Sequence, residues 1–556
     1  MSFATNSIQQ LRFDDSCNFL TERENGILKN SWATAFSKYI FPCINEKRFA
    51  VLYSSTAASR PNTPVNVVVG ALLLKEMFGS TDDELLEQIL FDVRYQVALN
   101  TISDTEQPVS DRTLSRFRER LYNYEVETGI DIMKQEVESL AGKFVKMLKI
   151  NPQMKRMDSV MVSSSCKKMA RLEILYTCVS NMVKAINNTG EAGILTKNLM
   201  RYLNKGDENN TLYRTPGEQV GTELERVVAD AVGLLELCGE AYEDLKEYQL
   251  LKRVVKEQTI DENGKIKVKS KAEITTDSLQ NPSDEDATFR EKAGEKHKGY
   301  VGNFVETFDE NGAIITSFDY QQNTHSDIAF CKEVIEELGK QEDPVTLIAD
   351  GAYGSVETVQ LAQENNIELV TTALIGKSPD EIVADFSIDE TTKIIASCPA
   401  GYAPTDCNYK GITDTYRAHF DKKTCENCPY HDRCGVVFQK KTALVRVSGK
   451  TMQRAAYLKK LSTEEYQTVK NKRNGVEGIP SILRRRYGVD HMPVRGLLRS
   501  KCWYNLKIGA INVMRVLAVA LFYLFLTLVF VTVNLNQKFK LLVSSERYSN
   551  PVFIAF

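Results

Sequence analysis

The sequence has almost no excess of one charge, although it is 556 residues long. Seventy lysines and arginines stand against 73 acidic residues, which leaves a formal net charge of −3. A protein that coats nucleic acid by charge alone is strongly basic, so this class of protein is excluded. Any polyanionic partner must therefore be bound by local basic patches.

The sequence also lacks the features of an exported, disulfide-stapled protein. Twelve cysteines are too few for a disulfide scaffold of this length, and residues 1–20 are polar throughout, without the apolar stretch of a secretory signal. Both observations predict reduced thiols and a cytoplasmic location. Internal repeats and low-complexity tracts are absent too. With 43% hydrophobic and 26% charged residues, the chain is predicted to be globular with more than one domain.

Hydrophobic patterns divide the chain into blocks. Residues 1–62 form a mixed extension, and 63–150 have helical periodicity, with capping residues such as Thr81 and Ser110 before the helices. Residues 151–515 alternate strands and helices around the hairpin signal "ENG", which predicts an α/β domain with a mixed sheet. This domain contains a helical insertion at 165–260 and an irregular, cysteine-bearing insertion at 375–450. A hydrophobic tail covers 516–556.

Two aspartates occur where strands of such a sheet would carry a site. Asp350 directly follows the apolar run Val345–Ala349 in "VTLIADGAYGS", and Asp158 lies within "RMDSVMV". Ligands of open α/β sheets collect at the carboxyl ends of strands. Two adjacent carboxylates repel each other unless a cation lies between them, and oxygen ligands favour Mg²⁺ or Mn²⁺. The alternative is that Asp350 only begins a glycine turn.

Glu477 is the candidate third carboxylate. It lies in a basic stretch, residues 470–501, which contains nine lysines and arginines and two acids. If the stretch is helical, Arg473, Glu477 and Arg484 share one face, where the arginines would suit contact with DNA phosphates. The nearby glycines and Pro480 predict a helix junction at Glu477. The alternative is a solvated, charged helix.

Together these segments resemble a DDE transposase of a bacterial insertion sequence. "RMDSVMV", "IADGAYGS" and "RNGVEG" resemble the segments that carry the two aspartates and the glutamate, and the helical pattern from residue 63 resembles the N-terminal domain of such transposases. Relatives place Tyr, Arg and Lys around the glutamate. Here Arg473 matches the arginine, Arg484 stands in for the lysine, and Lys470 replaces the tyrosine.

The resemblance implies a fold and an activity. The fold would be an RNase-H-like mixed sheet flanked by helices, and Asp158, Asp350 and Glu477 would hold two Mg²⁺ or Mn²⁺ ions for DNA cleavage and strand transfer. The partners would be the terminal inverted repeats and the target DNA, bound by a homodimer or larger assembly. Two alternatives stay open: an inactive transposase-derived DNA-binding protein, and another RNase-H-like nuclease.

A cysteine cluster predicts a second kind of metal site. "CENCPYHDRC" places Cys425, Cys428 and Cys434 in C-x2-C-x5-C spacing, and Cys398 lies upstream. Four soft ligands around turns can hold a structural Zn²⁺. The alternative is a group of reduced, half-buried thiols, since the second C-x2-C pair of a zinc ribbon is missing.

Two further features have open interpretations. The candidate DNA contacts are Arg112, Arg116 and, near the glutamate, Arg485. The helix around Arg112 is either part of a helix-turn-helix that recognises the terminal repeats, a solvated face or a dimer contact. Residues 516–535 lack any charge and are long enough to span a bilayer. A buried C-terminal helix competes with membrane association, and a cytoplasmic, nucleoid-associated protein is favoured.

Overall fold

The chain was analysed as a computed structural model. It describes residues 1–6, 20–54, 60–102, 107–262, 265–292, 294–341, 343–389 and 391–546, with side-chain surroundings as far as Phe522. Most of the polar N-terminal stretch and much of the hydrophobic tail, both used in the sequence predictions, therefore lie outside what can be described.

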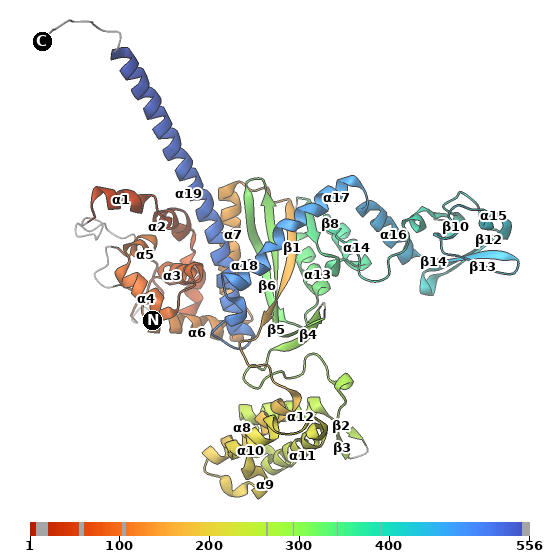
Figure 1. The fold of residues 1–556 in the computed structure, drawn as a ribbon, viewed down its shortest axis with the longest axis horizontal. Helices are drawn as coiled ribbons and strands as arrows, with labels where there is room; N and C mark the ends of the chain where they lie inside the picture. The colour runs from red at the N-terminus through yellow and green to blue at the C-terminus, as the bar shows by residue number, and fades with distance from the viewer. Residues whose placement is uncertain are drawn as a thin grey trace.

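A six-stranded mixed sheet forms the centre of the protein (Figure 1). The long strand β5 pairs with β1 along one edge and with β4 and then β6 along the other, all antiparallel. Strands β7 and β8 continue the sheet beyond β1 in parallel. The strands are β1 (Met154–Ser163), β4 (Thr288–Lys292), β5 (Glu295–Asp309), β6 (Gly312–Gln322), β7 (Val345–Ala349) and β8 (Ile367–Thr371). The predicted hairpin and mixed sheet are confirmed.

Helices cover both faces of this sheet. On β1, Met157 and Met161 pack into the core beneath α13 (Asp327–Leu338) and α14 (Val356–Glu364). Val160 and Val162 point to the opposite face, because successive strand residues alternate. They join the core formed with α7 (Ile132–Leu148) and α19 (Leu497–Glu546).

The N-terminal helices share that second core with the sheet. Their capping residues act as predicted, since Thr81 and Ser110 accept bonds from the first turns of α4 and α6. Trp503 of α19 is buried under the Lys75 ammonium and the Arg118 guanidinium, so these cations fasten α19 to the helices. The main helices here are α1 (Glu22–Lys29), α2 (Trp32–Ala35), α3 (Val65–Phe78), α4 (Asp82–Phe91), α5 (Val93–Ala98) and α6 (Asp111–Thr128).

The helical insertion after β1 folds as a bundle with its own core. Leu175, Val179, Val227 and Leu251 are buried in it, separately from the sheet. Figure 1 shows the bundle projecting from one end of the sheet. Its elements are α8 (Arg171–Asn188), α9 (Lys197–Met200), α10 (Lys205–Tyr213), α11 (Val220–Cys238) and α12 (Lys246–Gln258), followed by the small hairpin of β2 (Thr259–Glu262) and β3 (Lys265–Val268).

The cysteine-bearing insertion is an arm with regular strands, which corrects the prediction of an irregular segment (Figure 1). In β12, Tyr416, Ala418 and Phe420 alternate with more exposed residues, so a strand signal is present but short. The arm contains β9 (Ser387–Asp389), β10 (Ile394–Ser397), β11 (Asp406–Lys410), β12 (Thr415–Asp421), α15 (Lys422–Glu426), β13 (Val436–Phe438) and β14 (Thr442–Ser448). It returns to the sheet through α16 (Gly449–Leu461) and α17 (Glu464–Asn471).

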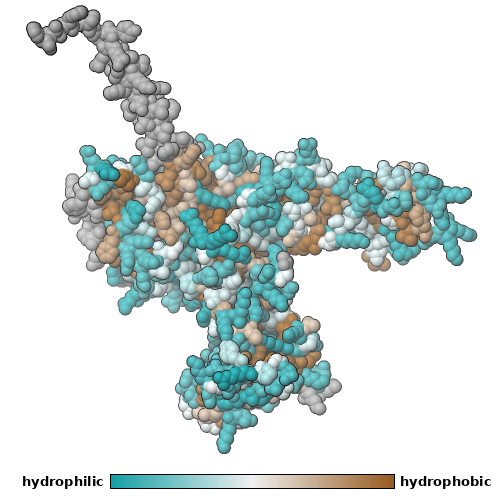
Figure 2. All heavy atoms as spheres, viewed as in Figure 1, coloured by the Kyte–Doolittle hydropathy of each residue, from teal (hydrophilic) through white to brown (hydrophobic). Residues whose placement is uncertain are grey.

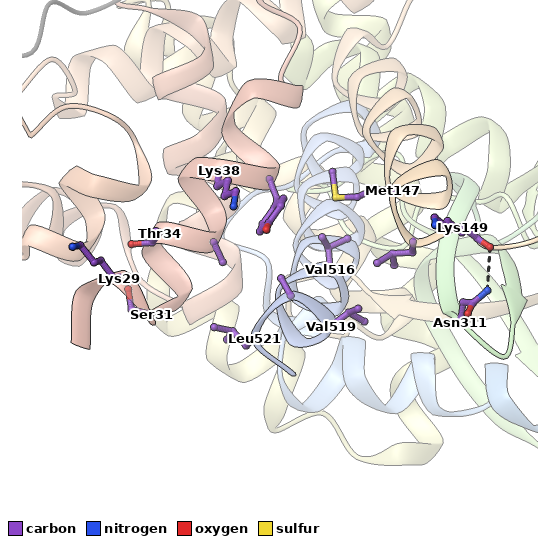
Figure 3. Close-up of a pocket in the computed structure, with 14 residues that line it drawn as sticks. Lys29, Ser31, Thr34, Lys38, Met147, Lys149, Asn311, Val516, Val519 and Leu521 are labelled. Carbon is purple, nitrogen blue, oxygen red and sulfur yellow. Dashed lines mark hydrogen bonds between the residues drawn. The ribbon is translucent and has the colours of Figure 1, made fainter. Parts of the chain in front are cut away.

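The first part of α19 is a core helix. Its stretch Leu497–Phe522 is long and apolar enough to cross a membrane, but 61% of the apolar window is buried inside the protein. Figure 2 shows a mostly hydrophilic surface with hydrophobic patches near α19 and on the arm. Where the buried stretch ends, Val516 and Leu521 line a cavity of about 530 Å³ together with Lys29, Lys38 and Lys149 (Figure 3). The predicted membrane span, residues 516–535, continues past Phe522, and the side-chain surroundings of residues 523–535 lie outside the described part of the chain.

The contact between β5 and α19 predicts a sensitive position at Gly302. A Cβ built there would lie 2.5 Å from the Tyr504 ring, which is fully buried. Gly302→Ala is expected to lower the free energy of unfolding by about 1–3 kcal/mol through overpacking, measured by urea denaturation. The control is Gly142→Ala in α7, where the added methyl group meets nothing within 4 Å. It is expected to stabilise the helix by about 0.5–1 kcal/mol. Equal effects of the two changes would contradict this packing.

Candidate active site

The two predicted aspartates lie side by side at one edge of the sheet. Strands β1 and β7 are parallel neighbours, with Arg156 opposite Ile348. Continued by two residues, this register brings Asp158 level with Asp350. Asp350 comes directly after the last residue of β7, as predicted from the apolar run. The carboxyl end of β7 therefore brings together two acids that are far apart in the sequence.

Asp158 is a largely buried carboxylate. Its side chain is 16% exposed, and the Ser159 amide donates a hydrogen bond of 2.8 Å to Oδ1. Burial raises the pKa of Asp158 above its usual value, although the Ser159 bond and the nearby cations Arg473 and Lys292 pull that pKa back. The cost of burying the ionised Asp158 carboxylate is therefore only partly offset by these groups.

Asp350 both caps a turn and faces the site. Its Oδ1 accepts a bond of 2.6 Å from the Gly351 amide and one of 2.9 Å from the Thr372 hydroxyl. The other carboxylate oxygen, Oδ2, lies 4.0 Å from a guanidinium nitrogen of Arg473. Thr372 was not predicted from the sequence. It directly follows β8, so the rule that polar residues collect at the carboxyl ends of parallel strands could have found it.

Glu477 lies at a helix junction, as the glycines predicted. The 3-10 helix η13 (Lys472–Val476) ends before it and α18 (Gly478–Arg485) begins after it. Arg156 of β1 donates a bond of 2.7 Å to the Lys472 carbonyl, which fixes this segment against the sheet. A Cβ at Gly475 would overlap the Arg156 guanidinium, so the glycine permits this close approach. The third acid is thereby held over the edge that carries the two aspartates.

Arg473 joins all three acids. Its guanidinium nitrogens lie 3.3 Å from Asp158 Oδ2, 4.0 Å from Asp350 Oδ2 and 2.7 Å from Glu477 Oε1. The arginine side chain is only 13% exposed. One largely buried cation is thus shared by three carboxylates.

The donor set fits a hard divalent cation. Only carboxylate oxygens face the shared guanidinium, and Mg²⁺ and Mn²⁺ prefer such ligands. With the side chains as they stand, no group of three or more His, Cys, Asp or Glu within the described residues could hold a metal ion. Arg473 explains this for the three acids, since its guanidinium lies among them.

The other predicted DNA-contact arginines lie outside this cluster. Arg484 donates a bond of 2.9 Å to the Met161 carbonyl and pairs with Asp490, so it anchors α18 on β1. Arg485 is exposed on α18, and Arg112 and Arg116 are exposed one turn apart on α6.

The predicted zinc ligands gather in the arm, away from the acids. Cys398, Cys425, Cys428 and Cys434 all line one small cavity there. No disulfide joins the cysteines in the described part of the chain.

Two parts of the chain match family models of transposases. Residues 397–517 match the model of the Transposase DDE domain, and residues 28–120 match the Transposase domain (DUF772). The search of solved structures found the piggyBac transposase synaptic complex with hairpin DNA, at 10% identity and a TM-score of 0.26, covering 90% of this chain and 76% of that one. Among curated proteins nothing matches. Transposase models thus match both the N-terminal helices and the glutamate-bearing segment, which is consistent with an insertion-sequence DDE transposase.

Proposed function

We propose that this protein is the transposase of an insertion sequence and catalyses metal-dependent DNA cleavage and strand transfer at Asp158, Asp350 and Glu477. The observation that carries the proposal is that all three acids lie around one buried guanidinium at the end of β7. A structural role explains one such ion pair, but it does not explain three acids placed on a single cation.

The chemistry assigned to the residues is electrostatic. Two Mg²⁺ or Mn²⁺ ions, when bound, would supply activation of water and stabilisation of the attacking and leaving oxygens. The three carboxylates would hold these ions, and Thr372 and the Ser159 amide would orient the two aspartates. Arg473 would keep the acids together before DNA and metal arrive. No covalent intermediate is required, so the site needs no serine or cysteine nucleophile.

Several features support DNA as the substrate. Residues 470–501 form a basic stretch around Glu477, and Arg484 and Arg485 at the end of α18 and Arg486 directly after it are exposed. Arg112 and Arg116 add two exposed cations on α6, within the N-terminal transposase domain. The antiparallel strands β6, β5 and β1 followed by the parallel β7 and β8 support an RNase-H-like fold. Assembly as a dimer or larger complex on paired ends, in the cytoplasm, completes the proposal.

The decisive experiment measures excision and integration in cells. A donor plasmid carries a marker between the DNA segments that flank the gene, and the wild type is compared with Asp350→Asn. The wild type is expected to move the marker, and the variant is expected to lose at least about 100-fold of the activity, because a charge required for metal binding is removed. The control is Asp244→Asn, at an exposed position in the helical bundle.

The possible outcomes separate the candidate functions. Equal activity of Asp350→Asn and wild type would refute the catalytic assignment. Flank binding without movement would favour a relic that only binds DNA, a reading that Lys470 in place of the expected tyrosine also favours. Cleavage without dependence on the flanks would favour another RNase-H-like nuclease.

Arg473 is expected to stabilise the metal-free site. Arg473→Gln should destabilise the metal-free protein by about 1–3 kcal/mol, because three carboxylates then face one another without their shared cation. The stabilisation gained on adding Mn²⁺ should become larger than in the wild type, as seen in thermal melts with and without the ion. Exposed Arg485→Gln is the control. An unchanged response to Mn²⁺ would show that Arg473 does not share the site with the metal.

The negative charge of Asp158 is expected to lower the stability of the metal-free protein and to favour metal binding. Burial raises its pKa, so its ionised form costs the fold stability above the folded-state pKa, and the cost disappears as the pH falls through that value. Asp158→Asn should therefore melt higher than the wild type at neutral pH without metal, and the difference should shrink on acidification. The variant should also lose the Mn²⁺-induced shift. A lower melting temperature at neutral pH would contradict this account.

A further inference from the structure

The arm carries a second cluster of reactive side chains that the proposed reaction does not use. The thiols of Cys398, Cys425, Cys428 and Cys434 line a single cavity of about 20 Å³. Phe420 and Val445 of the arm sheet form part of the same lining. The cavity is large enough for one small ion or one water, and cysteines and apolar or aromatic side chains make up most of its lining.

Tight turns present these thiols from two separate segments. In the first, the Cys398 amide donates 2.9 Å to the Tyr402 carbonyl, and the Gly401 amide donates 2.8 Å back to the Cys398 carbonyl. Gly401 has a φ of +82°, which favours glycine.

The second segment contains the other three cysteines. Cys425 is the next-to-last residue of the short helix α15. The Cys428 amide donates 3.2 Å to the Cys425 carbonyl, and Gly435 with a φ of +75° follows Cys434. Backbone turns that expose successive thiols to one point are the usual frame of a tetrahedral Zn²⁺ site.

The four sulfurs are close enough to influence one another. Burial raises the pKa of Cys425 to about 11, and the thiols of Cys398, Cys434 and Cys428 raise that pKa further. As the side chains stand, the four cysteines are not arranged to hold a metal, so binding requires the four sulfurs to move closer together around the cavity.

Two other possible ligands in the arm, Cys407 and His431, bind other groups. The sulfur of Cys407 accepts a bond of 3.3 Å from the Ile395 amide, and Cys407 does not line the cavity. His431 lines it, but its Nδ1 lies 2.7 Å from the Cys428 carbonyl and its Nε2 lies 3.2 Å from Asp432. Four cysteines, without histidine, therefore make up the ligand set.

The arm has a physical need for such a site. Its hydrophobic core is small, and the cysteines pack at its margin. A module of this size is marginally stable from apolar burial alone and commonly requires a metal or disulfides. We propose that Cys398, Cys425, Cys428 and Cys434 bind one structural Zn²⁺ that closes the arm, independently of the catalytic site.

The first test measures metal in the purified full-length chain. Wild type grown with zinc is expected to retain about one Zn²⁺ per chain by elemental analysis, and Cys428→Ser is expected to lose it. Cys407→Ser is the matched control, since it removes a thiol of the same arm outside the cavity, and it should keep the metal. Absence of zinc from the wild type, iron in its place, or equal zinc in Cys428→Ser would each overturn the proposal.

A second measurement remains informative if Cys428→Ser fails to fold. Bound metal is removed from the wild type and replaced by Co²⁺. For tetrahedral sulfur ligands we expect a thiolate-to-cobalt charge-transfer band and strong d–d absorption. Thiol alkylation mapped by mass spectrometry should then spare these four cysteines until a chelator is added. Weak octahedral absorption, or equal alkylation with and without chelator, would refute the site.

Discussion

The arrangement of the active-site region depends on one electrostatic constraint: three carboxylates share the guanidinium of Arg473. Without a cation their mutual repulsion would separate the end of β7 from the segment that carries Glu477. Arg473 lies in that same segment, four residues before Glu477. When Arg473 binds the two aspartates, Glu477 is therefore also held close to them. The three acids are therefore brought together in the metal-free protein, and their negative charge would favour the divalent ions of the proposed function.

A second chain of charges holds this assembly on the scaffold. The Glu306 side chain is fully buried between the guanidinium groups of Arg156 and Arg515. Arg156 also binds the Lys472 carbonyl beside Arg473, and Arg515 belongs to α19. A strand, the core helix and the glutamate-bearing segment are thus linked through one buried carboxylate. Because α19 shares its core with the N-terminal helices, the two transposase domains form one packed unit.

The parts that could be predicted from the sequence are those with local signals. Asp350 follows an apolar run and precedes a glycine turn, and Gly475 and Pro480 indicate the junction at Glu477. The pairing of β1 with β7, by contrast, joins residues almost two hundred positions apart, and no local pattern sets that register. Thr372 was missed for the same reason, since its role exists only because β8 lies beside β7. The arm strands were missed because they are short and mostly half-exposed.

Helices α16 and α17 connect the arm to the sheet edge that carries the three acids, so the stability of the arm bears on that edge. Helix α16 leaves the arm sheet and is fastened near the end of β8, where the Tyr457 hydroxyl donates 2.7 Å to the Leu369 carbonyl and Arg454 binds the Leu374 carbonyl. Helix α17 follows, with the Tyr466 hydroxyl bonded to Glu368, and leads directly into the segment of Glu477. A less ordered arm would therefore make α16 and α17 less ordered, and these helices position Glu477 near the two aspartates. The match to the Transposase DDE domain begins at residue 397, beside the first cysteine, and runs through Glu477 into α19. The cysteines and the glutamate thus lie within one matched segment, in which a rigid arm would support the placement of Glu477.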